Sequence, residues 1–414
     1  MISEYTDKKN INEIFGVIII SFLPVMIFLG SGVLNLSIII LDLIFLIEIY
    51  RKKKIIYLKN NFFYSLIFLW FVLIFNCFIT SIDLHASLPR TLGFIRFIFF
   101  IFALIYFFKL KNNFYQNKIF QLWSFIFVII SFDLIYEYIT GYNVLGFKAE
   151  LPGRLVGFMK DEMKIGHFYS AFILISLITI DKVLNGPLFF KKSNFLKISI
   201  FYSFVLFFFI ISFLIGERAN FARILFFLTL FLVIFKKDYK VMLSILLISI
   251  FIFFNIMSNN DRFKQRFWLT FIFPLINDPV KTMFTPPYGN HYKVALEIFD
   301  NHKAFGVGIR NYVIESRKDI YSKDASVHPH QVHFEFLAEL GLSGYLIFFY
   351  FFIYSIFNAF KSFLTSKNFY QLAGILFIFA SLLPFIPSGS FFTTYGAVLF
   401  WLNFALLMQN NKSN

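Results

Sequence analysis

The sequence carries little charge for its length. Of its 414 residues, 15% are charged and 59% are hydrophobic, whereas soluble domains are about one quarter charged and about half apolar. A soluble fold of this size needs more charged side chains to cover its surface. The shortage of charge therefore excludes a soluble globular enzyme, and the abundance of apolar residues excludes a disordered protein.

Cysteine is almost absent. The single cysteine, Cys77, lies within an apolar run, so a disulfide framework and a cysteine-based metal site are both excluded. Phenylalanine is instead abundant, with 67 residues. Helices that face lipid tolerate so many large apolar side chains, whereas the packed core of a soluble protein does not.

Long apolar runs are the dominant feature of the chain. A helix that crosses a bilayer needs about 20 mostly apolar residues, and this criterion predicts twelve spans, the ones at 166–180, 223–235 and 393–408 being short. No cleavable signal peptide is expected, because the first span directly follows Lys8 and Lys9. The spans are predicted at 13–29, 31–49, 62–79, 91–108, 119–139, 166–180, 195–215, 223–235, 241–257, 343–360, 370–386 and 393–408.

Basic residues gather in alternate connectors between these spans. Cytoplasmic loops of membrane proteins are enriched in Lys and Arg, so we place these connectors and both termini in the cytoplasm. The net charge of +15 is then a topology signal, and nucleic acid is not an expected partner. The residues concerned are Lys8, Lys9, Arg51–Lys54, Lys109, Lys111, Lys191, Lys192, Lys236, Lys237, Lys240, Lys361, Lys367 and Lys412.

Two outer connectors are long, one from about Thr140 to Lys164 and the other from about Ser258 to Leu342. Loops of this length usually carry function. We therefore expect transmembrane helices at 1–257, an outer catalytic loop at 258–342, and transmembrane helices with a cytoplasmic tail at 343–414. Within the second connector, helices are predicted near 261–273, 288–299 and 328–340.

Arginine and lysine are distributed differently. Arg51 is the only arginine in the cytoplasmic connectors. Phosphate recognition distinguishes the two residues, because only the guanidinium offers a planar, bidentate fork. The pattern favours a phosphate-bearing ligand on the outer side, the alternative being that long outer loops use arginine by chance. The outer arginines are Arg90, Arg96, Arg154, Arg218, Arg223, Arg262, Arg266, Arg310 and Arg317.

The strongest chemical signal is the segment 327–344, which holds His328, His330 and His333. Pro329 suits the first turn of a helix, so we expect His330 in that first turn. The positive end of a helix dipole disfavours an imidazolium, and a general base needs a neutral imidazole. His330 is therefore the candidate catalytic residue, with His328 and His333 in supporting roles.

Clustered histidines also suggest a metal site. His330 and His333 would share one face of a helix, but no second cluster of histidines supplies the remaining ligands. No metal or other cofactor is therefore expected. Ordinary loop histidines remain the other interpretation of this segment.

Two more motifs lie at outer helix ends. Glu217 and Arg218 fall between two spans, where charge at membrane depth is costly and suggests function. Arg218 suits a clamp for a diphosphate, and an interfacial Glu217–Arg218 pair is the alternative. The Gly306-Val307-Gly308 turn is expected to bring backbone N–H groups and Arg310 close to an anion.

The first long connector holds Arg154, Asp161 and Glu162. The two carboxylates suit a cation or a sugar hydroxyl, and a solvated loop is an equally valid interpretation. We include all three residues as supporting members of the candidate site.

These motifs resemble the bacterial O-antigen ligase family, which belongs to a superfamily that includes the O-antigen polymerases. The stretch 330–344 fits the family pattern of His, then Asn, Ser or Gln, then nine residues and Gly-x-x-Gly. Further similarities are Gly-Glu-Arg-Ala-Asn at 216–220, Phe-Gly-Val-Gly at 305–308, and the Pro- and Ser-containing stretch at 384–392. The histidine motif does not separate ligases from polymerases.

The resemblance implies an all-helical, GT-C-like glycosyltransferase of the bacterial inner membrane with a periplasmic active site. Its donor would be a glycan on undecaprenyl diphosphate, transferred with inversion and without metal or nucleotide. His330 matches the family histidine that acts on the acceptor hydroxyl, and Arg218 matches an arginine that holds the diphosphate. The acceptor would be a lipid A-core sugar in a ligase, or a second lipid-linked repeat unit in a polymerase.

One position departs from the family pattern. Many members carry an arginine at the start of the helix before Gly-x-Gly, and this chain has Tyr288 near that place. Either His291, Arg266 or Arg310 supplies the second positive group for the diphosphate, or this chain handles its donor differently from those members.

A transporter of lipid-linked glycans is the non-enzymatic alternative. Transporters usually bind their substrate near the bilayer midplane, between internal repeats with broken helices. No internal repeat is evident in this chain, and its candidate residues fall outside the spans. An enzyme is therefore favoured, working among membrane lipids on lipid-linked substrates.

Overall fold

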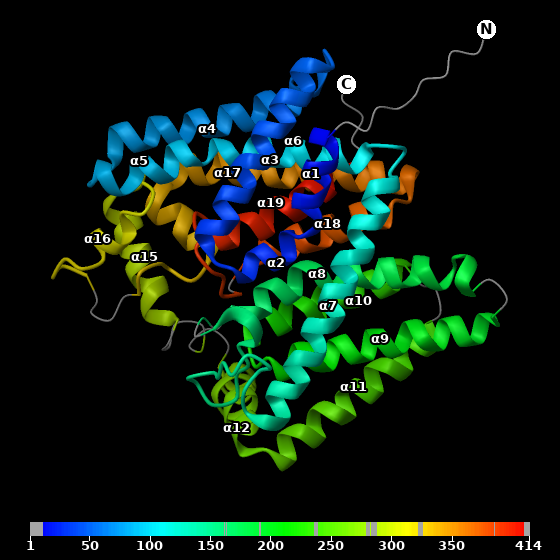
Figure 1. Ribbon diagram of the computed structural model, residues 1–414. Coiled ribbons are helices and arrows are strands. Elements are labelled where there is room, and N and C mark those ends of the chain that lie inside the picture. Colours follow the sequence, from blue (N-terminus) through cyan, green and yellow to red (C-terminus); the bar gives the residue numbers. More distant parts are fainter. Residues whose placement is uncertain are drawn as a thin grey trace, which may run out of the picture.

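The computed structural model consists of helices joined by mostly short connectors (Figure 1). It describes residues 11–160, 162, 164–189, 192–235, 239–278, 282, 288–321, 326–384 and 386–409. Over these residues all regular structure is helical and no strand occurs, which confirms the prediction of an all-α protein.

The α-helices are α1 (Ile11–Ser21), α2 (Leu23–Phe28), α3 (Ser31–Arg51), α4 (Asn61–Thr80), α5 (Leu84–Gly93), α6 (Ile95–Lys109), α7 (Phe114–Thr140), α8 (Ile165–Leu184), α9 (Asn194–Leu214), α10 (Arg218–Phe235), α11 (Tyr239–Asn259), α12 (Asp261–Phe263), α13 (Phe273–Asn277), α15 (Gly289–Asn301), α16 (Tyr312–Glu315), α17 (Val332–Ser366), α18 (Phe369–Ser381) and α19 (Thr394–Met408). Short 3₁₀ helices are η1 (Ile55–Leu58), η2 (Gly157–Met159) and η3 (Pro187–Phe189), and η4 (Lys264–Ile272) is a π-helix.

Many of these helices suit a bilayer. Eight helical stretches in the described part of the chain are long and apolar enough to cross a membrane, namely α3, α4, α5 with α6, α7, α8, α9, α10 and α17. The shorter apolar helices α1, α18, α19 and the Leu247–Asn259 part of α11 coincide with other predicted spans. The chain is thus a multi-pass membrane protein. The exact number of twelve crossings stays a prediction.

Lipid-facing surface explains the abundance of phenylalanine. On α4, Phe68, Phe71, Phe75 and Phe78 are 57%, 57%, 52% and 62% exposed. Residues three or four apart lie on one face of a helix, so these rings form a continuous apolar stripe. Such a stripe is unfavourable in water and suits contact with lipid chains.

Three helices, α6, α8 and α19, form the centre of the bundle. Nearly every side chain of each is buried, as expected for a helix that is apolar on all sides. The C-terminal helix α19 packs against α6, α8 and α18. The last predicted span therefore lies at the core of the fold rather than at its edge.

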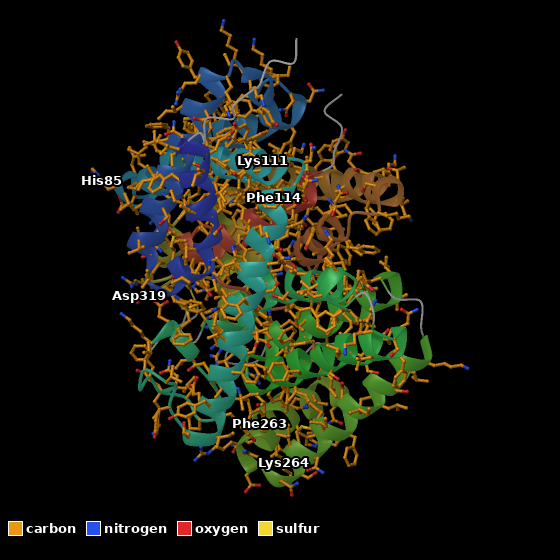
Figure 2. All side chains as sticks on the ribbon, turned by 45° about the vertical axis from the view of Figure 1, so that its right-hand side comes forward. His85, Lys111, Phe114, Phe263, Lys264 and Asp319 are labelled. Carbon is orange, nitrogen blue, oxygen red and sulfur yellow. The ribbon has the colours of Figure 1, made fainter. Side chains whose placement is uncertain are left out.

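The two ends of the bundle carry different parts of the chain. The turn between α6 and α7 lies at one end and α12 at the other, as both views show (Figures 1 and 2). Figure 2 labels Lys111 and Phe114 near the first end, and Phe263 and Lys264 at the second. A predicted cytoplasmic connector and the long predicted outer segment are therefore far apart. Which end faces the periplasm remains a prediction.

Acidic residues near the C-terminal end of α7 hold the first long connector in place. The Glu137 carboxylate accepts hydrogen bonds from the N–H groups of Val156 (3.0 Å) and Gly157 (2.7 Å). Asp133 accepts one from the N–H of Val144 at 2.9 Å. Charged hydrogen bonds to backbone donors are strong, so this loop is fixed against the bundle.

The second long connector folds into helices, with one correction. The predicted helices at 261–273 and 288–299 correspond to α12 with η4 and to α15. The third was expected to begin at His328, but α17 begins at Val332. The Gln331 side chain caps it by accepting from the N–H groups of His333 (2.6 Å) and Phe334 (3.1 Å). His330 has a φ of +57° and precedes the helix, so its predicted place in the first turn was wrong.

The helix α17 is broken at Gly341, whose φ of 66° and ψ of −171° are not helical. The segment 303–308 replaces the hydrogen bonds lost at the break. The Leu342 N–H donates to the Lys303 carbonyl at 2.8 Å, and the Gly308 N–H donates to the Glu339 carbonyl at 2.9 Å. The outer turns of α17 and its membrane-crossing part are thereby joined rigidly.

Glycine is required on both sides of this joint. A Cβ on Gly306 would meet the backbone of Glu339 and Gly341, and one on Gly341 would meet the backbone of Phe305 and Gly306. The N–H of Gly308 donates to the Glu339 carbonyl of α17, whereas the N–H of Gly306 donates to the His302 carbonyl just after α15. We expected these N–H groups to face an anion; instead both donate to carbonyls of the protein itself.

Candidate active site

Three histidines that are separated in sequence meet at one place. They are His291 on α15, and His328 and His330 just before α17. The ring centroids of His328 and His330 are 3.9 Å apart, and those of His291 and His330 are 5.3 Å apart. Ser326 links two of them, since its N–H donates to His291 Nδ1 at 3.0 Å and its Oγ lies 3.1 Å from His330 Nε2.

The clustered imidazoles are neutral at physiological pH. Burial lowers the pKa of His330 to about 3, helped by repulsion from His328 and His291. Burial also lowers the pKa of His328 to about 4 and lowers that of His291. Removal from water disfavours the charged imidazolium. The sequence also predicts a neutral imidazole, but it attributes the neutral state to a helix dipole. In the structure the causes are burial and repulsion between the clustered histidines.

His330 is held in an uncommon backbone conformation. A φ of +57° is left-handed and rare for residues other than glycine. The N–H of Ser388 donates to the His330 carbonyl at 2.6 Å, which fixes this conformation from outside the loop. Backbone strain that the surroundings maintain in this way is typical of functional sites.

Arg223 supports the segment that contacts His330. Its Nη2 donates to the carbonyl of Pro387 at 2.7 Å, one residue before Ser388. Arg223 lies on α10 and is only 6% exposed. The sequence indicates it as an outer arginine but assigns it no role, because the Pro387 carbonyl that it contacts lies more than 160 residues away.

His333 does not join the cluster. Its Nε2 lies 2.8 Å from the Leu382 carbonyl oxygen, and its Nδ1 lies 3.2 Å from the Tyr345 hydroxyl. Both ring nitrogens therefore have partners, one in Leu382 just after α18 and the other in Tyr345 on α17 itself. The position favours a structural role for His333, in keeping with the secondary place that the sequence assigns to it.

A group of arginines lies at the start of α10. Arg218 is the first residue of that helix, and its Nη1 donates to Thr270 Oγ1 at 3.2 Å and to the Arg266 carbonyl at 3.4 Å. The Arg266 side chain donates through Nε to the Gly216 carbonyl at 2.7 Å. Two of the predicted phosphate-binding arginines are thus neighbours.

A third arginine and a carboxylate complete this arginine cluster. Arg154 forms an ion pair with Glu217 at 3.4 Å, and Glu217 also accepts from the Gly166 N–H at 3.1 Å. Burial lowers the pKa of Arg266 to about 10, and repulsion from Arg154 and Arg218 adds to this effect. Three guanidiniums against one carboxylate leave an excess of positive charge.

Tyr288 lies between the histidines and this arginine cluster. Its ring centroid is 5.5 Å from that of His330, and its side chain lies near Arg218 and Arg266. The position that carries arginine in many members of the resembled family therefore lies at the centre of the site here. A tyrosine there offers a hydroxyl in place of a positive charge.

A cavity of about 660 Å³ opens beside the histidines. Among the predicted site residues, His328, Glu162 and Arg310 line it, whereas Arg218 and Arg266 do not. Glu162 is paired with Lys164 at 2.8 Å. Asp161, predicted together with Glu162, lies outside the described residues.

The histidine cluster does not form a metal site within the part of the chain that the structure describes. No group of three or more His, Cys, Asp or Glu side chains is placed there to hold an ion. The chemistry available is therefore that of neutral imidazoles beside guanidiniums. This combination suits proton transfer next to an anionic leaving group.

A sequence comparison relates the part of the chain that carries these residues to a known family. Residues 203–349 match the O-antigen ligase family model. The match begins in α9, ends in α17, and contains Arg218, Arg266, His291, His328 and His330. No curated protein matches the chain. Over residues 203–349 the chain is therefore similar to the O-antigen ligase family, whose members are glycosyltransferase-type enzymes.

Proposed function

We propose that this protein transfers a glycan from undecaprenyl diphosphate to a sugar hydroxyl of the lipid A core. The transfer takes place at the periplasmic face of the inner membrane, with inversion and without metal or ATP. The observation that carries the proposal is the neutral histidine cluster next to an arginine cluster with excess positive charge. Tyr288 connects the two groups.

In this mechanism His330 is the general base. It takes the proton of the acceptor hydroxyl as the hydroxyl oxygen attacks the anomeric carbon of the donor. The bond from that carbon to the diphosphate oxygen breaks, and the diphosphate leaves with the electron pair. A pKa of about 3 makes the imidazole a weak base without substrate, and the negative diphosphate raises the pKa when it binds nearby.

Arg218 and Arg266 hold the departing diphosphate. Guanidiniums stabilise the charge that develops on the leaving oxygen, and their orientation is fixed before the reaction by Thr270 and Gly216. Arg154 and Glu217 support this arrangement through their ion pair. An anion offsets the repulsion among the three arginines, so substrate binding is favoured by the same charges that assist the reaction.

The test is glycan transfer by the purified protein in liposomes from an undecaprenyl-diphosphate-linked donor. His330→Ala should lower the rate by about 10²–10⁴-fold, the usual cost of losing a general base. Donor retention should persist, because arginines bind the diphosphate. His85→Ala is the matched control, since His85 is exposed on α5 (Figure 2) and does not line the cavity beside the histidines. A wild-type rate in His330→Ala would refute the assignment of the base.

The O-antigen polymerase is the alternative for the same residues, because only the acceptor differs. Two reactions therefore have to be compared: donor with lipid A-core acceptor, and donor alone. Longer lipid-linked glycans from donor alone indicate polymerisation. Glycan attached to the core indicates ligation. Release of undecaprenyl diphosphate accompanies both, whereas a transporter moves the donor without releasing it.

A further inference from the structure

A second cavity lies toward the other end of α17 from the histidines. It has a volume of about 1130 Å³ and shares no lining residue with the cavity beside His328. Its wall includes Asn61 at the start of α4, Lys109 at the end of α6 and Lys361 near the end of α17. The part of α17 between the break at Gly341 and Lys361 is about 30 Å long, so this cavity is remote from the reacting residues.

The cavity is formed where α4, α6 and α17 come together. Helices α4 and α19 each pack against both α6 and α17. The helix α19 adds Met408 to the wall, and η1 adds Tyr57. An occupant therefore touches several helices of the bundle at once, and its binding is expected to stabilise their packing.

The charge of the wall is positive. Lys109 and Lys361 are its charged residues, and no aspartate or glutamate lines it within the described part of the chain. Both lysines are exposed. The Lys361 ammonium lies 4.2 Å from the centre of the Phe357 ring, on its own helix. Basic pockets between membrane-crossing helices attract the anionic head groups of lipids.

Neutral polar groups extend the basic part of the wall. Tyr57 and Asn358 line the cavity and are half-buried, and Asn61 lines it at the surface. Their hydroxyl and amide groups donate hydrogen bonds, which phosphate and ester oxygens can accept. The polar part of the wall is thus rich in donors and free of acidic side chains, as recognition of a phosphate group requires.

The wall becomes apolar with distance from the helix ends. On α17, Phe351 precedes Lys361 by about 15 Å along the helix, and on α6, Phe102 precedes Lys109 by about 10 Å. The Phe62 ring packs against both rings, with centroids 6.2 Å from Phe351 and 5.6 Å from Phe102. An occupant that satisfies the whole wall has an anionic head at the helix ends and apolar chains beside the rings.

The position of the cavity in the bundle fits a phospholipid. Lys109 directly precedes the α6–α7 turn, which lies far from α12 (Figures 1 and 2). A phospholipid in the leaflet at this end places its head at the level of the lysines and its chains beside the rings. A soluble anion would instead leave the aromatic part of the wall in contact with water.

We propose that this cavity binds an anionic phospholipid, with its phosphate at Lys109 and Lys361 and its acyl chains along Phe62, Phe102 and Phe351. The lipid is a structural ligand of the bundle and not a substrate. It belongs to the leaflet that the lysine pattern predicts to be cytoplasmic. The proposal does not rest on glycan transfer, because the cavity is remote from the histidines.

The test measures lipid retention by the full-length protein, delipidated in detergent, with native mass spectrometry. Phosphatidylglycerol and phosphatidylcholine with the same acyl chains are titrated separately. Phosphatidylglycerol should be retained in preference and should raise the Tm. Lys109→Gln and Lys361→Gln should each lower the affinity for phosphatidylglycerol about fivefold, and the double variant about 25-fold, as expected for basic residues near an anionic lipid. Both lysines are exposed, so the variants are expected to fold.

Lys118→Gln is the matched control. Lys118 is exposed near the start of α7 and does not line the cavity. Like Lys361, it lies over the ring of a phenylalanine one helical turn earlier, which is Phe114 for Lys118 and Phe357 for Lys361. Lys118→Gln should bind phosphatidylglycerol like the wild type. Equal losses of affinity in Lys118→Gln and Lys361→Gln would overturn the site, and so would unchanged retention in the double variant.

Glycerol phosphate distinguishes a lipid from a soluble anion. It carries the same phosphate without acyl chains, so it should not displace phosphatidylglycerol at the concentrations at which the lipid binds. Displacement at those concentrations would overturn the lipid as the occupant. Equal retention of phosphatidylcholine and phosphatidylglycerol by the wild type would overturn the role of the lysines. None of these results depends on whether the protein transfers a glycan.

Discussion

At the scale of single residues, His330 depends on contacts made by its backbone as much as on its ring. Its left-handed φ of +57° is held by the N–H of Ser388, and the segment before Ser388 is held by Arg223. A side chain on α10 thus determines where the imidazole points. Arg223 is for this reason a positioning residue as well as part of the cavity wall.

Replacing Arg218 by lysine should impair turnover although the charge is kept. An ammonium cannot reproduce the two parallel hydrogen bonds of a guanidinium to a diphosphate. A charge-assisted hydrogen bond contributes roughly 1.5–3 kcal/mol. We therefore expect the loss of one such bond to lower the rate of turnover about 10–100-fold. The measurement is glycan transfer at saturating acceptor, with exposed Arg262→Lys as the control. Full activity in Arg218→Lys would leave only an interfacial role for Arg218.

The histidine cluster should make the fold less stable in acid. Its folded pKa values lie near 3 and 4, below the unfolded value of about 6.5. The unfolded chain therefore binds more protons between these values, and stability is lost as the pH falls below about 6.5. The Tm between pH 7 and pH 5 should fall more steeply in the wild type than in His330→Gln. If the Tm fell equally steeply with pH in the wild type and in His330→Gln, His330 would not be buried as described.

At the scale of elements, the joint between α17 and the segment 303–308 is the least expected feature. The hydropathy of the sequence indicates the helices correctly, because each apolar run needs only its own residues to form a helix. The break at Gly341 depends on carbonyl and N–H groups from Lys303 to Gly308. Contacts between distant parts of the chain leave no local periodicity, so the sequence motif alone suggested an anion-binding turn.

The same limit applies to the candidate site. The histidines and Arg218 are predictable, because their residue types and spacing indicate chemistry. Arg223 and the Ser388 N–H are not assigned from sequence, because their roles follow from which elements meet. The helix start was misplaced by a few residues, since Gln331 and not His328 caps α17.

Replacing Gly306 by alanine should destabilise the protein. Alanine would have to adopt a φ of +68° and would contact the backbone of Glu339, at a cost of about 1–3 kcal/mol or more. The measurement is the Tm in detergent. Gly32→Ala is the control, because Gly32 lies in α3 with no atom near its added Cβ. Alanine stabilises helices relative to glycine, so the two variants should shift the Tm in opposite directions.

At the scale of the whole molecule, a predicted cytoplasmic connector and part of the predicted outer segment lie at different places in the bundle. The α6–α7 turn lies far from α12 in both views (Figures 1 and 2). The lysine-rich connector is thus distant from the outer segment that holds Arg262 and Arg266. This separation is what a protein with phosphate chemistry on one side of a membrane requires.

The predicted topology can be checked directly. Reporter domains fused after Lys237 and after Asn277 should report opposite sides of the membrane, the first cytoplasmic and the second periplasmic. The reason is the asymmetry of lysine between the connectors. A fusion after Lys111 should agree with the one after Lys237. Reports from the same side at Lys237 and Asn277 would contradict the arrangement of the spans between them.

The helix α17 joins the reacting residues to the membrane across the break at Gly341, which the segment 303–308 bridges by hydrogen bonds. The part after the break, residues 342–366, has a length of about 37 Å, more than the roughly 30 Å of a hydrocarbon core. Long helices tilt when the hydrocarbon thickness of the surrounding lipid changes, and the first turn of α17 follows directly after His330 and Gln331. The thickness of the bilayer is thereby part of the geometry of the active site.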